Sequence, residues 1–148
     1  MKGSGPLRGG CLCGAVGFEV QGETLGVYQC HCSACRRITG SNANASCIVA
    51  RDDLAWTRGE SHVRSYVHGS GYRSDFCATC GSPAPNIMRN GTHYWVPAGA
   101  LQDTERLCLR VHLCVASKAA WETGPMSGRC HDGVPSLDEL IALLTTEA

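Results

Sequence analysis

The chain has 148 residues, of which 43% are hydrophobic, and its 13 lysine and arginine residues balance 13 acidic residues to a formal net charge of +0. This length suits one domain with a core of its own, and a balanced charge offers no overall field to attract nucleic acid or a membrane surface. No apolar stretch approaches the ~20 residues of a membrane span. We therefore predict a soluble single domain with neither a nucleic-acid nor a membrane partner.

Segments with the alternating or β-branched pattern of strands recur along the chain, separated by turns rich in glycine, asparagine and proline. They cover residues 15–20, 47–49, 63–67, 93–96 and 107–115. In the last of them leucine and valine alternate with other residues, so that His112 shares a face with Cys108 and Cys114. The pattern predicts a mainly β protein built on antiparallel sheet.

One segment near the end has helical periodicity. Ser136 is placed as its N-cap, and Glu139 three residues later completes a capping box. Its apolar stripe consists of Leu137, Leu140, Ile141 and Leu144. We expect a short C-terminal helix over residues 137–146, joined to the sheet by a surface loop at 122–135.

Seven of the 11 cysteines fall into three tight clusters. The clusters are Cys11 with Cys13, Cys77 with Cys80, and Cys30 with Cys32 and Cys35. Such spacing is typical of zinc sites. A disulfide scaffold is disfavoured because residues 1–10 contain no apolar segment of a signal peptide and the cysteine count is odd. Free thiols suit a reducing cytoplasm, which is the predicted location.

The order of the clusters suggests how they divide between two sites. The two separate pairs make a closed four-thiolate structural site from Cys11, Cys13, Cys77 and Cys80. The middle cluster can hold a second metal alone, through Cys30, Cys32 and Cys35, with a fourth position left for water or for a ligand thiolate. Zinc is inferred from the softness of thiolate ligands. We expect two zinc ions per chain, the second site being occupied fully or in part.

Several ordered motifs resemble one known family. They are GGCLCGAVGFEV at 9–20, CHCSACRRITGS at 30–41, FCATCGSP at 76–83, GALQD at 99–103 and VHLCVASKAAW at 111–121. Together they are similar to the glutathione-dependent formaldehyde-activating enzymes, also called the GFA or CENP-V-type zinc domain. The resemblance covers residues 7–121, with 122–148 expected as a loop and helix packed on the same domain. It implies an Mss4-like β-sheet fold around the two zinc–cysteine sites.

The resemblance also implies a carbon–sulfur lyase reaction, the reversible condensation of formaldehyde with the thiol of glutathione to give S-hydroxymethylglutathione. The expected partner is therefore a small glutathione-derived thiol adduct, with Cys30, Cys32 and Cys35 holding the catalytic zinc. His31 could donate a proton or could only space two ligands. Arg36 and Arg37 could bind a substrate carboxylate or could only offset the anionic cluster.

Two other functions fit the same motifs. One is a zinc-stabilised binding module without catalysis, in which the second site is saturated and unreactive. The other is a thiol oxidoreductase, which needs a redox-active cysteine outside the clusters. Cys47, Cys108 and Cys114 are interpreted as small buried residues of strands. Cys130, next to His131, is expected in the loop before the helix, as a plain thiol or a reserve ligand.

Overall fold

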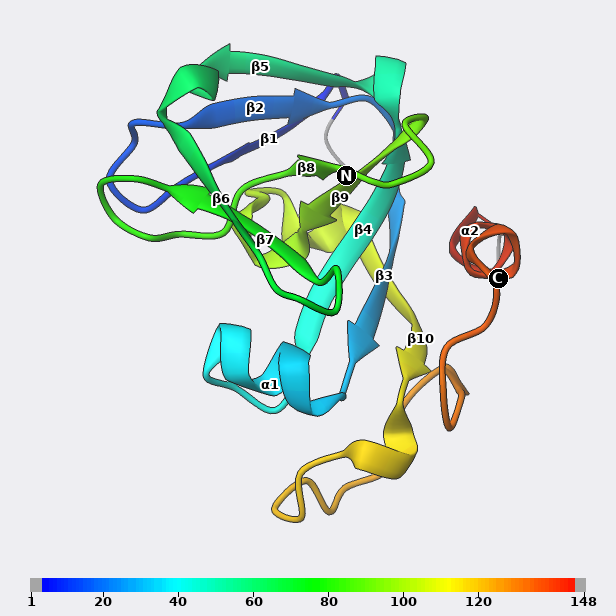
Figure 1. The fold of residues 1–148 in the computed structure, drawn as a ribbon. Helices are drawn as coiled ribbons and strands as arrows, with labels where there is room; N and C mark the ends of the chain where they lie inside the picture. The colour runs from blue at the N-terminus through cyan, green and yellow to red at the C-terminus, as the bar shows by residue number, and fades with distance from the viewer. Residues whose placement is uncertain (1–3, 146–148) are drawn as a thin grey trace.

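A computed structural model describes residues 4–145 as three sheets and two helices (Figure 1). The strands are β1 (Leu7–Gly10), β2 (Gly17–Val20), β3 (Leu25–Cys30), β4 (Asn44–Ala50), β5 (Leu54–Arg58), β6 (Val63–Val67), β7 (Arg73–Cys77), β8 (Asn86–Ile87), β9 (His93–Pro97), β10 (Leu107–Leu113) and β11 (Arg129–Cys130). The helices are α1 (Ser33–Thr39) and α2 (Leu137–Thr145). Neither of these helices is long and apolar enough to cross a membrane.

The largest sheet has the strand order β11-β10-β3-β4-β9-β8. Helix α2 packs on its β3 and β10 strands, and the buried contact consists of Tyr28, Val111, Leu113, Leu140 and Leu144. The close approach depends on Gly26 in β3, because a Cβ atom there would collide with the backbone of Leu144 at the end of α2. The helix is thereby fixed over the strand that ends at Cys30.

A second core lies between this sheet and the three-stranded sheet β1-β2-β5. Its buried residues are Leu7, Phe18, Val20, Val27, Cys47, Val49, Leu54, Val96, Ala98 and Leu101. Arg106 is 1% exposed beside it and donates hydrogen bonds to the carbonyl oxygens of Gly5, Gly22 and Glu23. These bonds replace the water that a buried guanidinium loses.

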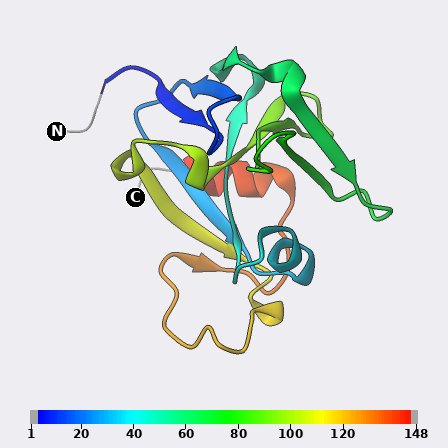
Figure 2. The ribbon, with the colours of Figure 1, turned by 90° about the vertical axis from the view of Figure 1, so that its left-hand side faces the viewer.

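The third sheet is the β6–β7 hairpin, which has a cysteine at one end and a tyrosine that reaches α1 at the other. Cys77 ends β7, and the hairpin turn at residues 68–72 places Tyr72 near α1. Figure 2 shows the hairpin (green) projecting from the body of the fold, and the segment that follows β10 (yellow to orange) extending below the sheets.

The mainly β class and the short C-terminal helix are confirmed. The amide of Glu139 donates to the hydroxyl of Ser136 across 3.2 Å, as expected of the cap; residue 146, the last of the expected helix, lies outside the described residues. Most strand pairs are antiparallel, as expected, but β10 runs parallel to both β3 and β11. The strand also ends at Leu113, not at residue 115, and the expected loop contains β11.

Candidate functional site

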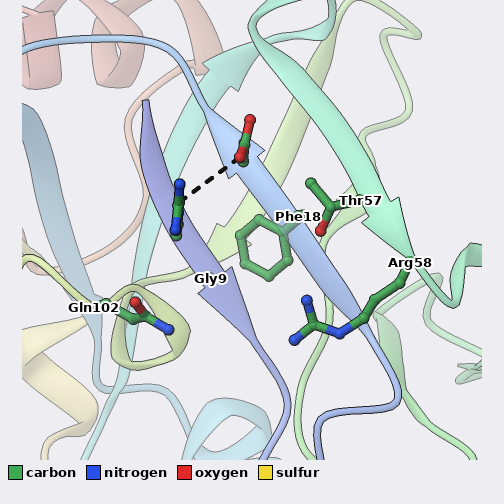
Figure 3. A pocket seen from close by; sticks show the side chains of 7 residues that line it. Gly9, Phe18, Thr57, Arg58 and Gln102 are labelled. Carbon is green, nitrogen blue, oxygen red and sulfur yellow. Dashed lines mark ion pairs between the residues drawn. The ribbon is translucent and has the colours of Figure 1, made fainter. Parts of the chain in front are cut away.

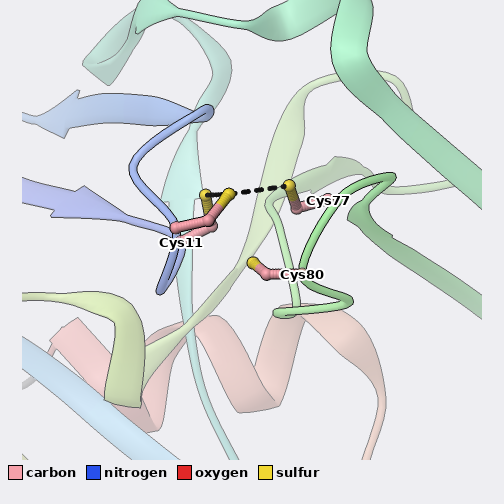
Figure 4. A group of neighbouring side chains, drawn as sticks. Cys11, Cys77 and Cys80 are labelled. Atoms are coloured by element: carbon pink, nitrogen blue, oxygen red, sulfur yellow. Dashed lines mark hydrogen bonds between the residues drawn. The ribbon is translucent and has the colours of Figure 1, made fainter.

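Four thiols from two distant parts of the chain converge on one point. Cys11 and Cys13 lie in the turn between β1 and β2, whereas Cys77 and Cys80 flank the knuckle after β7. Their sulfur atoms all lie within 4.8 Å of one another, with 3.6 Å between Cys11 and Cys13 and 3.8 Å between Cys13 and Cys77. Figure 4 shows Cys11, Cys77 and Cys80 pointing toward one another across this gap. The four-thiol cluster could hold a metal ion.

Hydrogen bonds prepare the four-thiol cluster for negative charge. The amide of Val16 donates to the sulfur of Cys11 across 3.2 Å, and the hydroxyl of Ser82 lies 3.2 Å from the sulfur of Cys80. The Ser82 hydroxyl, followed by backbone amides, lowers the pKa of Cys80 to about 5. Since the thiolate is the form that binds metal, these contacts favour ligation at neutral pH.

Replacement of Ser82 by alanine is expected to weaken metal binding at the four-thiol cluster by roughly 10-fold, in the range found for hydrogen-bond partners of metal ligands. The hydroxyl lowers the Cys80 pKa and also accepts a bond from the amide of Leu12 across 3.0 Å. Competition with a chromogenic chelator measures the change. Ser74→Ala, in β7 and on the wall of the larger cavity, is the control and should leave the affinity as it is; equal effects of the two substitutions would contradict the assigned role.

The middle cluster forms where β3 leads into α1. Cys30 ends β3, Cys32 is the N-cap of α1, and Cys35 lies in its first turn. The sulfur of Cys32 accepts a hydrogen bond from the amide of Cys35 across 3.3 Å. The three sulfur atoms lie within 4.8 Å of one another, so this three-thiol cluster could also hold a metal ion. The thiol of Cys35, together with burial, raises the pKa of Cys30.

The three-thiol cluster opens onto a cavity of about 800 Å³. Its walls come from α1, the β6–β7 hairpin, β8 and β9, the end of β10 and the start of α2. The apolar side chains of the lining are Ile38, Val67, Pro83, Ile87, Met88, Trp95, Leu113, Val134, Pro135, Leu137 and Leu140. The four-thiol cluster contributes nothing to this lining. Only the three-thiol cluster therefore meets a space large enough for a small molecule.

Tyr72 brings a polar side chain to the three-thiol cluster. Its hydroxyl lies 3.3 Å from the sulfur of Cys35, and the amide nitrogen of Asn44 donates to it across 3.4 Å. Burial raises the pKa of Tyr72, so the phenol keeps its proton at neutral pH. No sequence motif marks Tyr72, because it belongs to a hairpin turn some 37 residues from Cys35.

His31 lies between two cysteines of the cluster but does not line the cavity. The side chain is fully buried, with Nδ1 at 3.0 Å from a carboxylate oxygen of Glu122 and Nε2 at 2.9 Å from Nδ1 of His112. Burial and the neighbouring His31 lower the pKa of His112. The buried chain Glu122–His31–His112 ties the Cys30–Cys32 segment to β10 and to the loop beyond it.

Four arginines lie near the three-thiol cluster or line the cavity. Arg36 and Arg37 lie in the last turn of α1 and are absent from the cavity lining, whereas Arg73 and Arg89 line it. Arg73 forms two bonds with Asp75, of 2.8 and 2.9 Å. Arg89 is an exposed residue on the rim, beside Gly71.

The four cysteines outside the clusters have different surroundings. Cys47 is buried in the core, as expected. Cys108 is exposed, contrary to the expectation of a buried residue. Cys130, expected in the loop before the helix, is exposed as well. Cys114 is also not a strand residue. It follows the end of β10, is half-buried, and lines the same cavity as the three-thiol cluster. Burial and the adjacent Cys30 raise the pKa of Cys114 to about 12.

A smaller cavity of about 260 Å³ lies on the β1-β2-β5 sheet (Figure 3). The ring of Phe18 lies beneath Gly9, and the guanidinium of Arg58 points across one end. The lining contains no thiol or histidine. The three-thiol cluster lines the larger cavity instead.

Comparison of the chain with known proteins identifies its family. A family model described as glutathione-dependent formaldehyde-activating enzyme matches residues 6–117. The chain belongs to the glutathione-dependent formaldehyde-activating enzyme (GFA) family. The resemblance predicted from the cysteine motifs is thereby confirmed.

Two individual relatives extend the comparison. A Halomonas elongata protein described as a "putative glutathione-dependent formaldehyde-activating enzyme" is 30% identical over 146 residues, which covers 92% of each chain. A solved structure of a Rhodobacter sphaeroides protein is similar over 64% of this chain and 87% of that one, with a TM-score of 0.52 and 29% identity. The similarity to the Halomonas elongata protein therefore extends beyond the segment that the family model matches.

Proposed function

We propose that this protein forms or cleaves a thiol–aldehyde adduct of the S-hydroxymethylglutathione type at the three-thiol cluster. The observation that carries the proposal is the opening of Cys30, Cys32 and Cys35 onto the apolar cavity, while the four-thiol cluster has no such space. Membership of the GFA family supports formaldehyde and glutathione as the reactants. We place the reaction in the cytoplasm because free thiols persist there.

Both clusters fit zinc. Four thiols within 4.8 Å match a closed structural site, and three thiols beside a cavity match a site with one open position. Zinc bound by Cys30, Cys32 and Cys35 would lower the pKa of a substrate thiol that reaches it, as coordination does for thiols in general. Arg36 and Arg37, just beyond the third ligand, would offset the negative charge of the thiolates.

The remaining steps belong to side chains of the cavity. The substrate thiol binds against the three-thiol cluster, and its sulfur forms a bond to the aldehyde carbon. As the carbon–oxygen double bond opens, the oxygen takes up the proton that the thiol released, so the reaction is balanced without an oxidant. Tyr72 stays protonated and, held by Asn44, is placed to donate a hydrogen bond to that oxygen. Cleavage of the adduct follows the same steps in reverse.

Binding of the rest of the thiol compound is assigned to the rim of the cavity. Arg73 is engaged by Asp75, which leaves the Arg89 guanidinium to pair with a glutathione carboxylate. His31 and its buried partners would hold the Cys30–Cys32 segment in place during turnover, a positioning role that needs no contact with substrate.

The proposal is tested by NMR exchange spectroscopy of formaldehyde with glutathione. Zinc-loaded protein should accelerate the exchange over buffer, protein stripped of metal by a chelator should not, and restoring zinc should restore the acceleration. Two bound zinc ions with exchange at the buffer rate would overturn the proposal and favour a binding module on the same fold.

Tyr72→Phe is expected to slow the exchange by roughly 10- to 100-fold, because one hydrogen-bond donor to the developing oxyanion is lost. Zinc content should not change, since the hydroxyl is not a ligand. Tyr66→Phe, on the exposed face of the same hairpin, provides the matched control. A Tyr72→Phe enzyme as fast as this control would remove Tyr72 from the mechanism.

A further inference from the structure

Cys114 is a fourth thiol on the wall of the cavity that the three-thiol cluster faces. Strands β3 and β10 run parallel, with Leu113 opposite Cys30, so Cys114 is the next residue beyond that pair. The amide of His31 donates to the carbonyl of Leu113 across 2.9 Å, which fixes the two strand ends together. Cys30 and Cys114 both pack against the Tyr28–Leu113 core under α2.

The backbone of Cys114 is unusual. Its φ of 56° and ψ of 39° are left-handed, and it is the one non-glycine residue with positive φ among residues 4–145. Side chains other than glycine rarely adopt this conformation unless the surroundings impose it, and such residues concentrate at functional sites. Here the amide of Cys114 donates to the carbonyl of Gly133 across 3.0 Å, and Val115 donates to His131 across 3.0 Å. The loop after β10 therefore holds the turn in place.

We propose that Cys114 is the fourth ligand of the metal held by Cys30, Cys32 and Cys35, and that a substrate thiol enters by taking its place. The inference rests on the proposed zinc at this cluster and identifies what fills its open position at rest. A tetrahedral ion with three protein thiolates requires one further donor, and Cys114 is the only other thiol of the cavity lining. Its sulfur lies outside the group of three that approach one another within 4.8 Å, and in this proposal it is therefore the ligand that a substrate thiol displaces.

Zinc K-edge X-ray absorption of the fully loaded protein tests this assignment. With Cys114 bound, the mean coordination is about four sulfur atoms per zinc ion. In Cys114→Ser it should fall to about three and a half, and zinc should leave the second site roughly 10-fold faster when a chelator is added. Cys108→Ser, a matched change of an exposed cysteine, should preserve both values.

A second variant separates ligation from folding. Cys114→Gly removes the thiol but accepts the left-handed backbone without strain, so it should fold with two zinc ions and show the same lower sulfur number. A mean of three and a half sulfur atoms in the wild type, or no change in either Cys114 variant, would overturn the assignment. The sulfur count does not depend on the exchange assay, so failure of the proposed reaction and failure of this ligand assignment are distinguishable.

Discussion

Cys77→Ala is expected to lower the free energy of unfolding by about 5 kcal/mol or more, which corresponds to a fall in Tm of roughly 10–20 °C for a domain of this size. Cys77 is fully buried and joins the knuckle after β7 to the β1–β2 turn, 64 residues earlier in the chain at Cys13. Zinc binding in small metal-binding peptides contributes about 10–16 kcal/mol, of which a fold with its own cores shows only a part. Thermal unfolding with and without chelator measures the effect.

The matched control is Cys47→Ala, which removes another fully buried cysteine, from the core between the sheets. Its cost should be about 1 kcal/mol, from lost packing alone, and its Tm should keep the wild-type response to chelator. If the two variants were equally stable and both lost Tm on chelation, the four-thiol cluster would not be the structural metal site.

Cys32→Ser should abolish the acceleration of formaldehyde–glutathione exchange while the protein stays folded with one zinc ion in place of two. Serine is a preferred N-cap residue, so its hydroxyl can accept from the amide of Cys35 as the thiol does. The variant therefore removes a ligand and leaves the start of α1 intact. Metal content by mass spectrometry and the NMR exchange rate are measured on the same preparation.

Comparison with Cys32→Ala separates the two roles of this residue. Alanine removes the cap as well as the ligand, which should cost an additional ~1 kcal/mol of stability, whereas the loss of exchange should be the same in both variants. Full exchange activity in Cys32→Ser with one zinc ion bound would place the chemistry away from the three-thiol cluster.

The sequence predicted the class of fold and the cysteine motifs because both are local signals. Spacing of one or two residues brings thiols together wherever the chain turns. The capping box and the apolar stripe predicted the position of α2, whose first residue is Leu137 as expected. The parallel pairing of β10 was missed because alternation along a strand does not say which strand lies beside it. The boundary at Leu113 was missed because the left-handed turn at Cys114 uses a residue type that does not signal one.

The surroundings of the three-thiol cluster were less predictable because they are formed by residues distant in sequence. His31 turns away from the cavity because Glu122 and His112, both distant in sequence, provide polar partners in the interior. Tyr72 and Arg89 reach the cavity from a hairpin turn and from the segment after β8, where no motif marks them. Side chains that act through tertiary contact leave little trace in a single sequence.

The two thiol clusters differ in how far apart their cysteines lie in the sequence, and this difference affects the order in which they can bind metal during synthesis. The three-thiol cluster is contained in one short segment and can bind metal as soon as Cys35 has been made. The four-thiol cluster must wait for Cys80, and the central strand β3 must wait longer still for β10, about 80 residues further along the chain. Contacts so distant in sequence form slowly. If metal binds both clusters, the nascent chain is therefore expected to load the three-thiol cluster first and to close the four-thiol cluster only when much of the protein has been made.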